Sequence, residues 1–114
     1  MDSIAPLLIA KALDGLHARY QATAENIANA NTPSYRPLNV TFEARLEAAA
    51  RQGAEAVANV IPQLELAPAR GLGSEMRLDL EIATASQTAM RYAALVDILG
   101  RGMAISRAVV RGGN

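Results

Sequence analysis

Apolar and small residues recur at heptad spacing near both ends of this 114-residue chain. In the first segment the steps alternate between four and three residues, through Ile9, Leu13, Leu16, Tyr20, Thr23, Ile27 and Ala30. Such a seam lies along one side of an α-helix and is typical of helices that pair along their length. It predicts a long N-terminal helix within residues 1–31, because the prolines at 33 and 37 forbid helix beyond it.

A second long helix is predicted over residues 76–111. Its seam again steps by three and four residues, through Ile82, Ala85, Ala89, Tyr92, Val96, Leu99, Met103, Ser106 and Val110. Another apolar line runs beside this seam, at Leu95, Ile98, Gly102, Ile105 and Val109. A wider core face would explain two lines. We favour a partner helix from another molecule, because a helical hairpin needs only one interacting side.

The middle segment, residues 32–75, gives weaker signals of secondary structure than the two ends. Residues 39–42 favour a short extended stretch, and residues 42–61 favour a short helix interrupted at Gly53. Residues 62–74 favour an extended connector or a short strand. The sequence therefore predicts one mainly α domain over residues 1–114. Its N- and C-terminal helices pack as an antiparallel coiled-coil-like pair, joined by an irregular or partly extended middle.

The composition restricts the classes of partner. Aromatic residues make up only 4% of a chain that is 51% hydrophobic, so thin, closely packed helices are expected instead of a thick core. The formal net charge is zero, which argues against nucleic acid as the main partner. Asp97, Arg101 and Arg107 interrupt the apolar C-terminal stretch, so no membrane insertion is expected. We also expect no cleaved signal peptide, because Asp2 stands where positive charge is usual.

The sequence contains no residue pattern typical of a catalytic site. His17 is the single histidine and no cysteine is present, so a typical zinc site cannot form. Asp79 and Glu81 are two residues apart and point in different directions on a helix. We therefore expect no enzyme activity, no catalytic residue, no metal, no cofactor and no small-molecule substrate.

The segment Asn26-Ile27-Ala28-Asn29-Ala30-Asn31-Thr32-Pro33-Ser34-Tyr35 resembles the signature shared by flagellar rod and hook proteins. The segment 90–99, MRYAALVDIL, looks like the C-terminal helix of the short proximal rod subunits, and Leu78-Asp79-Leu80-Glu81 resembles the acidic entry to that helix. One position departs from the signature. Ser34 stands where the family usually has glycine, and it would be strained if the turn needs a positive φ.

This resemblance implies a structural subunit of the flagellar basal-body proximal rod, assembled through its terminal helices into a helical tube that transmits torque. It implies a location in the periplasmic rod and type III export without a cleaved signal. The implied partners are other rod proteins, the basal adaptor that links the rod to the membrane ring, and copies of this chain. The alternative from a different class is a small helical adaptor or secretion chaperone that binds a partner helix.

The residues expected at the assembly interface come from the two helices and from the loop between Asn26 and Tyr35. The amides of Asn26 and Asn29 either hold the following loop against the helix or bond to a neighbouring subunit. The C-terminal helix is expected to be the main intersubunit surface. The full set is Leu13, Leu16, Tyr20, Asn26, Ile27, Asn29, Asn31, Thr32, Pro33, Tyr35, Tyr92, Leu95, Val96, Ile98, Leu99, Met103, Ile105 and Val109.

Overall fold

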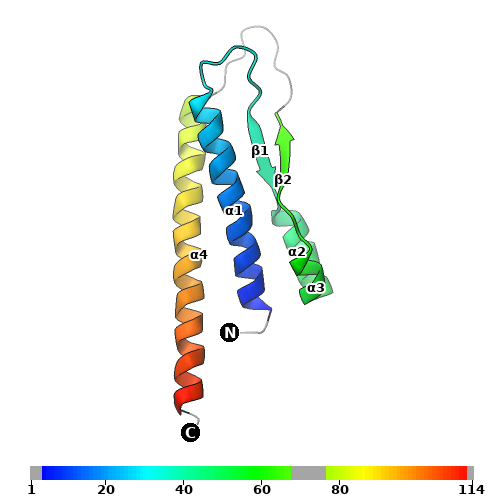
Figure 1. Cartoon of the computed structure of the whole chain (residues 1–114), viewed down its shortest axis with the longest axis vertical. Coiled ribbons are helices and arrows are strands. Elements are labelled where there is room, and N and C mark those ends of the chain that lie inside the picture. Colours follow the sequence, from blue (N-terminus) through cyan, green and yellow to red (C-terminus); the bar gives the residue numbers. More distant parts are fainter. Residues whose placement is uncertain (1–3, 68–76, 113–114) are drawn as a thin grey trace.

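The computed structural model describes residues 4–67 and 77–112. The fold is mainly helical, with long helices at both ends that pack against each other, as predicted (Figure 1). The elements in chain order are α1 (Ala5–Ala28), β1 (Leu38–Thr41), α2 (Glu43–Gln52), α3 (Ala54–Ala58), β2 (Gln63–Leu66) and α4 (Leu78–Gly112).

The molecule is long and thin, with extents of 68 × 27 × 14 Å on its Cα atoms. The helix α1 lies between α4 on one side and the β1–β2 hairpin on the other (Figure 1). From the end where α1 finishes, α4 returns beside it and continues past the point where α1 begins (Figure 1). A shape this thin leaves long helices with broad exposed faces, because each has few neighbours.

The best-buried apolar side chains lie between α1 and the middle segment. The helix α4 contributes only Leu95, which packs against this core from its margin. The heptad seams of the two terminal helices predicted a core between those helices instead. The buried set is Leu16, Ala22, Val40, Phe42, Leu46, Ala49 and Val57.

The middle segment has the predicted extended and helical pieces. A short strand falls on residues 38–41, and the helix that follows breaks at Gly53, whose φ of 115° suits glycine. The strand β2 covers part of the predicted connector, and residues 68–74 of that connector lie outside the described residues. The pairing itself was not predicted: β1 and β2 form an antiparallel hairpin with Val40 opposite Leu64.

The helix α1 packs on two sides, against α4 and against the middle segment, so the expectation of one seam is wrong. Leu16 and Thr23 of the predicted seam are buried, but Tyr20 is exposed. A second side of α1 packs against the middle segment at Gly15. A Cβ added at Gly15 would lie 2.4 Å from a ring carbon of Phe42, so only glycine lets the ring approach this closely.

Candidate assembly surfaces

Asn26 is the hydrogen-bonding centre of the molecule and is only 1% exposed. Its Nδ2 donates to the Leu38 carbonyl at 2.9 Å and to a Glu81 carboxylate oxygen at 3.1 Å. Its Oδ1 accepts from the Leu38 N–H and from the Tyr35 hydroxyl, both at 2.8 Å. Both donors and both acceptor positions of the amide are thereby used. Asn26 therefore ties α1, β1 and α4 together within one molecule.

The loop after α1 is held by two further polar contacts. Asn29 donates from Nδ2 to the Glu25 carbonyl at 2.9 Å, and its Oδ1 accepts from the Thr32 hydroxyl at 3.0 Å. Burial raises the pKa of the Tyr35 phenol, and the Glu25 and Glu81 carboxylates raise that pKa further. The phenol therefore keeps its proton and donates to Asn26. Of the two readings left open for Asn26 and Asn29, these contacts match the one in which the amides hold the loop.

Ser34 has a φ of 64°, the positive angle that the glycine of the rod and hook signature would supply. A left-handed conformation is costly for a residue with a Cβ, by roughly 1–2 kcal/mol. Among the described non-glycine residues, Ser34 alone has a positive φ. The departure from the signature therefore puts a strained serine at this turn.

Replacement of Ser34 by glycine is expected to raise the free energy of unfolding by up to about 1 kcal/mol, because relief of the strain exceeds the entropy gained by the unfolded chain. Urea denaturation followed by circular dichroism measures this change. The matched control is Ser86→Gly in the interior of α4, which should lose about 0.5–1 kcal/mol. Equal destabilisation by both changes would show that the turn at Ser34 is unstrained.

Arg19 holds the other end of the hairpin against α1. Its guanidinium forms two hydrogen bonds of 2.7 Å with the Glu43 carboxylate and a third, of 2.8 Å, with the Val40 carbonyl. It also lies 5.0 Å above the centre of the Phe42 ring. The hydrogen bonds from Arg19 lower the pKa of Glu43 from its ordinary 4.5 to about 2. Neither Arg19 nor Glu43 was singled out by the sequence, since a charge pair 24 residues apart has no local signal.

The Glu43 carboxylate should make stability depend on pH. A folded pKa below the unfolded value stabilises the protein above pH 4.5, and this contribution disappears as the pH falls through about 2. Because the Glu43 side chain is about half exposed, we expect about 1 kcal/mol at neutral pH. Urea denaturation of wild type and Glu43→Gln should show that difference at pH 7 and almost none at pH 2.

The control for this prediction is Glu47→Gln, which breaks the exposed ion pair with Arg51. Such i,i+4 pairs contribute only about 0.3–0.5 kcal/mol. A Glu43→Gln effect that is no larger than that of the control at pH 7, or that persists at pH 2, would contradict the assignment.

The side of α4 that faces α1 combines residues of both predicted lines with Thr88, which belongs to neither line. Thr88 and Gly102 are buried on it, and Leu95 and Leu99 are half-buried. The prediction that the whole seam faces the N-terminal helix is therefore wrong. Most of that seam is exposed instead, namely Ile82, Ala89, Tyr92, Val96, Met103, Ser106 and Val110. Ile98, Ile105 and Val109 of the second line are exposed as well.

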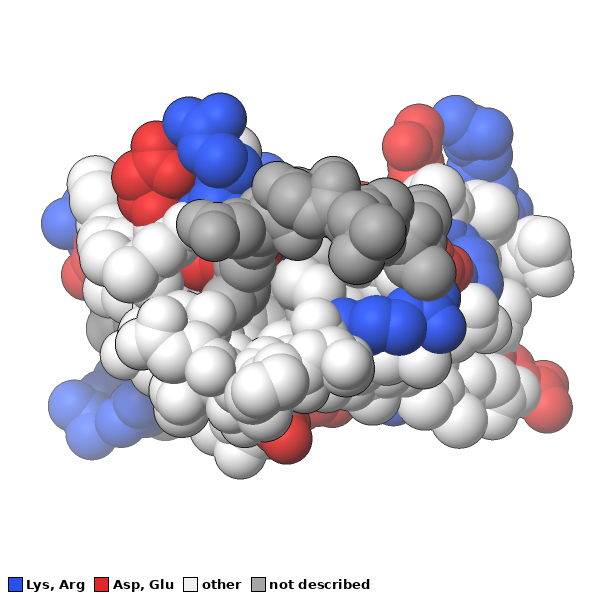
Figure 2. Space-filling view, turned by 90° about the horizontal axis from the view of Figure 1, so that it is seen from above, with Lys and Arg blue, Asp and Glu red and all other residues white. Residues whose placement is uncertain are grey.

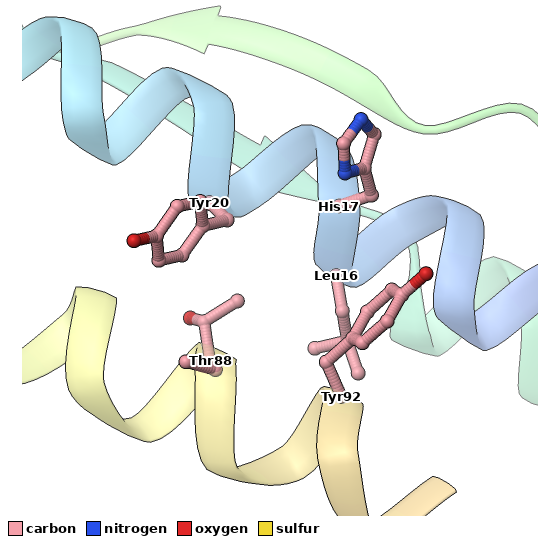
Figure 3. A pocket seen from close by; sticks show the side chains of 6 residues that line it. Leu16, His17, Tyr20, Thr88 and Tyr92 are labelled. Atoms are coloured by element: carbon pink, nitrogen blue, oxygen red, sulfur yellow. The ribbon is translucent and has the colours of Figure 1, made fainter. Parts of the chain in front are cut away.

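An open groove of about 210 Å³ lies between α1 and α4. In Figure 3 the side chains of Tyr20 and Leu16 approach those of Thr88 and Tyr92 from the facing helix, and His17 stands at the rim. The groove is mostly apolar, and the Thr88 hydroxyl already donates to the Thr84 carbonyl at 2.6 Å. The described residues contain no group of three or more His, Asp or Glu side chains that could hold a metal ion.

The structure divides the predicted interface residues by exposure. Leu16 and Asn26 are buried within the molecule. Six are half-buried: Leu13, Ile27, Asn29, Tyr35, Leu95 and Leu99. The others are exposed and free to meet another molecule, namely Tyr20, Asn31, Thr32, Pro33, Tyr92, Val96, Ile98, Met103, Ile105 and Val109.

Charge and hydropathy place few further restrictions on the surface. At the end of the molecule shown in Figure 2, basic and acidic side chains are interspersed, so charge of one sign does not gather there. No helix among the described residues is long and apolar enough to span a membrane. No protein-family model matches this chain, and no curated protein is significantly similar to it.

Proposed function

We propose that this chain is a structural subunit of the bacterial flagellar proximal rod, of the FlgB type, and that it assembles through its terminal helices into a helical tube that transmits torque. The segment Asn26–Tyr35 supports the rod and hook family, and the segment 90–99 supports this short class of rod subunit. Ser34 adds support, because it adopts the positive φ that the family's usual glycine would take.

The C-terminal end of α4 gives the strongest structural support for this proposal. Every residue from Met103 to Gly112 is exposed, yet Ile105, Val109 and Val110 are β-branched residues that favour helix poorly. Most helical stability in proteins comes from tertiary packing, and this end of α4 has none among the described residues of the molecule. Packing against another molecule would stabilise this end and cover its apolar side chains, which is the requirement of a subunit that folds fully on assembly.

Within the subunit we propose that α1 and α4 pair as an antiparallel coiled-coil-like hairpin. The covered residues of α4 include Glu81, Thr84, Thr88, Leu95, Leu99 and Gly102. These positions follow steps of three, four and seven residues, which is heptad spacing. Small residues on this line would allow the two helices to approach closely.

The same proposal gives the location and the partners. The chain would lie in the periplasmic rod after export without a cleaved signal. It would contact copies of itself, other rod proteins and the basal adaptor that joins the rod to the membrane ring. It would neither catalyse a reaction nor bind nucleic acid.

Ile105→Asp is expected to abolish rod assembly and motility, because it places a charge on an exposed apolar line without disturbing the subunit core. Swimming and basal-body counts in the encoding bacterium measure the effect. The matched control is Ala104→Asp, one residue away and nearer the side of α4 that already carries Asp97 and Arg101. Equal motility of the two variants, at equal expression, would contradict the assembly role of this line.

The α1–α4 groove favours a second candidate function, a small helical adaptor or secretion chaperone. Its apolar lining, with Tyr20 and Tyr92 exposed at the surface, would accept one side of a partner helix. An adaptor would form a soluble complex of fixed stoichiometry and would be absent from purified basal bodies.

A further inference from the structure

The loop between α1 and β1 contains a tight turn, Thr32-Pro33-Ser34-Tyr35, in a strained form. The Tyr35 N–H donates to the Thr32 carbonyl at 3.3 Å. Pro33 takes the second position of the turn, and Ser34 takes the third with a φ of 64°. These are the features of a type II turn, whose third position favours glycine because it requires a positive φ. The same proline also fits a type I turn, in which the third residue takes a negative φ that suits serine. The turn therefore has a relaxed alternative.

The side chain of Tyr35 connects this turn to the interior of the molecule. Its hydroxyl donates to the Asn26 Oδ1 at 2.8 Å, and Asn26 is buried. The three residues of the turn before Tyr35 are exposed. Because Ser34 directly precedes Tyr35, its φ helps to set the direction in which the tyrosine ring leaves the turn. A change of this φ to a negative value would draw the hydroxyl away from Asn26, so the hydrogen bond favours the strained form.

The start of α4 is bound to the same amide. The Asn26 Nδ2 donates to a Glu81 carboxylate oxygen at 3.1 Å. Among the described residues, no other side-chain hydrogen bond joins α4 to another element. The threonine and serine hydroxyls of α4 that form hydrogen bonds donate to carbonyls of α4 itself. The turn and the start of α4 therefore meet at one buried amide group.

The two contacts with this amide strengthen each other. The Leu38 N–H and carbonyl fix the orientation of the Asn26 amide, so that Tyr35 bonds to its oxygen and Glu81 to its nitrogen. The carboxylate makes the bond from the nitrogen charge-assisted, which increases the negative charge on the amide oxygen and makes it a better acceptor. Such mutual polarisation is strongest in a buried site, where water does not screen it. The loss of either contact therefore weakens the other.

We infer that the turn at Ser34 is a two-state device coupled to α4: the Tyr35–Asn26 bond keeps the turn in its strained form, and the docked start of α4 supports that bond through Glu81. When either contact breaks, the turn relaxes to the type I form. Such coupling is reciprocal, so a molecule that binds the exposed turn in one form changes how firmly α4 is held. All the parts lie in one molecule, so the inference goes beyond the proposed function and does not depend on it.

Nuclear magnetic resonance distinguishes the two forms of the turn in the whole chain. The Hα of Pro33 lies much closer to the amide proton of Ser34 in a type II turn than in a type I turn, so the nuclear Overhauser effect between them reports the form. This effect should be strong in the wild type. Tyr35→Phe should reduce it several-fold, because the variant keeps the ring and lacks the hydroxyl. The control, Tyr20→Phe, removes a hydroxyl at the exposed α1–α4 groove and should leave the effect unchanged.

Two further variants test the strain and the coupling separately. Ser34→Gly added to Tyr35→Phe should restore the strong Overhauser effect, because glycine adopts a positive φ without strain. Glu81→Ala should reduce the effect at the turn, although the substitution lies on α4 outside the loop. Its control is Glu47→Ala, which removes the carboxylate of an exposed ion pair in α2 and should have no effect on the turn.

Amide hydrogen exchange in the same samples tests the reciprocal effect. Tyr35→Phe should speed exchange of the amides at residues 82–88 of α4 several-fold. Residues 95–102 of the same helix should keep their wild-type rates, since they lie far along α4 from Glu81. Circular dichroism of each variant establishes that it folds.

Three results would overturn the inference. The first is an Overhauser effect that Tyr35→Phe leaves at wild-type strength, because the bond would then not hold the turn. The second is failure of Ser34→Gly to restore the effect, because the turn would then not be relaxing from strain. The third is an unchanged turn in Glu81→Ala together with unchanged exchange at residues 82–88 in Tyr35→Phe, because the turn and α4 would then be uncoupled. None of these results bears on the rod assignment, which basal bodies test.

Discussion

Asn26→Leu is expected to lower the free energy of unfolding by about 3–5 kcal/mol, because a side chain of similar size removes four hydrogen bonds at once. The N–H and carbonyl of Leu38 would lose their partners beside α1, and the Tyr35 hydroxyl would lose its acceptor. Urea denaturation monitored by circular dichroism measures the change. In a protein this small, such a loss is a large part of the total stability.

The matched control is Asn29→Leu, the same substitution one helical turn later. Asn29 is only half-buried, and its partners Glu25 and Thr32 can bond to water instead. We expect a loss of about 1 kcal/mol or less. Equal losses for Asn26→Leu and Asn29→Leu would mean that the buried amide does not organise the junction of α1, β1 and α4.

Gly15→Ala should destabilise the protein by about 1–3 kcal/mol, although alanine normally stabilises a helix by about 1 kcal/mol relative to glycine. The added Cβ would meet the Phe42 ring at 2.4 Å and force it out of the core. Thermal or urea unfolding measures the difference. The control is Gly100→Ala in α4, where nothing lies within 4 Å of the new Cβ, so the same substitution should stabilise.

A double-mutant cycle with Phe42→Leu identifies the cause. Because the smaller side chain leaves room for the added methyl, Gly15→Ala should cost much less in the Phe42→Leu background, with a coupling of about 1 kcal/mol or more. Stabilisation by Gly15→Ala in the wild-type background, or additive effects of the two substitutions, would show that Phe42 does not require glycine at position 15.

The two long helices could be predicted closely because their signal is local and repeats. Heptad spacing and the Thr32-Pro33 boundary fix α1 to within a few residues, and the extended stretch at 39–42 and the break at Gly53 follow from local residue preferences. The pairing of β1 with β2 was not predicted. Its contacts join segments some 25 residues apart, and no residue type at one strand identifies the other.

The second side of α1 was missed because most of its residues are not apolar. Gly15, Arg19, Ala22 and Asn26 step by four, three and four residues, which is the same heptad spacing as the seam. Glycine, arginine and asparagine do not register in a hydrophobic pattern, yet each contacts the middle segment. The sequence did contain one signal of this packing, a glycine inside a predicted helix. Such a glycine allows a bulky side chain to approach the helix closely, and the chain has a single phenylalanine that could do so.

The side of α4 that faces α1 was misplaced for a related reason. The two predicted lines separated Leu99 from Leu95 and Gly102, although all three lie on the covered side of α4. Both lines also omitted the polar Thr88, which is buried on that side. Close packing of two helices selects small residues at their contact. Apolar residues on the flanks then remain exposed.

The central claim is that this chain is built into the proximal rod. Electron microscopy of purified basal bodies that carry a labelled copy of this subunit tests the claim most directly. The account predicts label on the rod close to the membrane ring, and basal bodies without a rod when the gene is deleted. Label that is absent from basal bodies, with intact rods in the deletion strain, would contradict it.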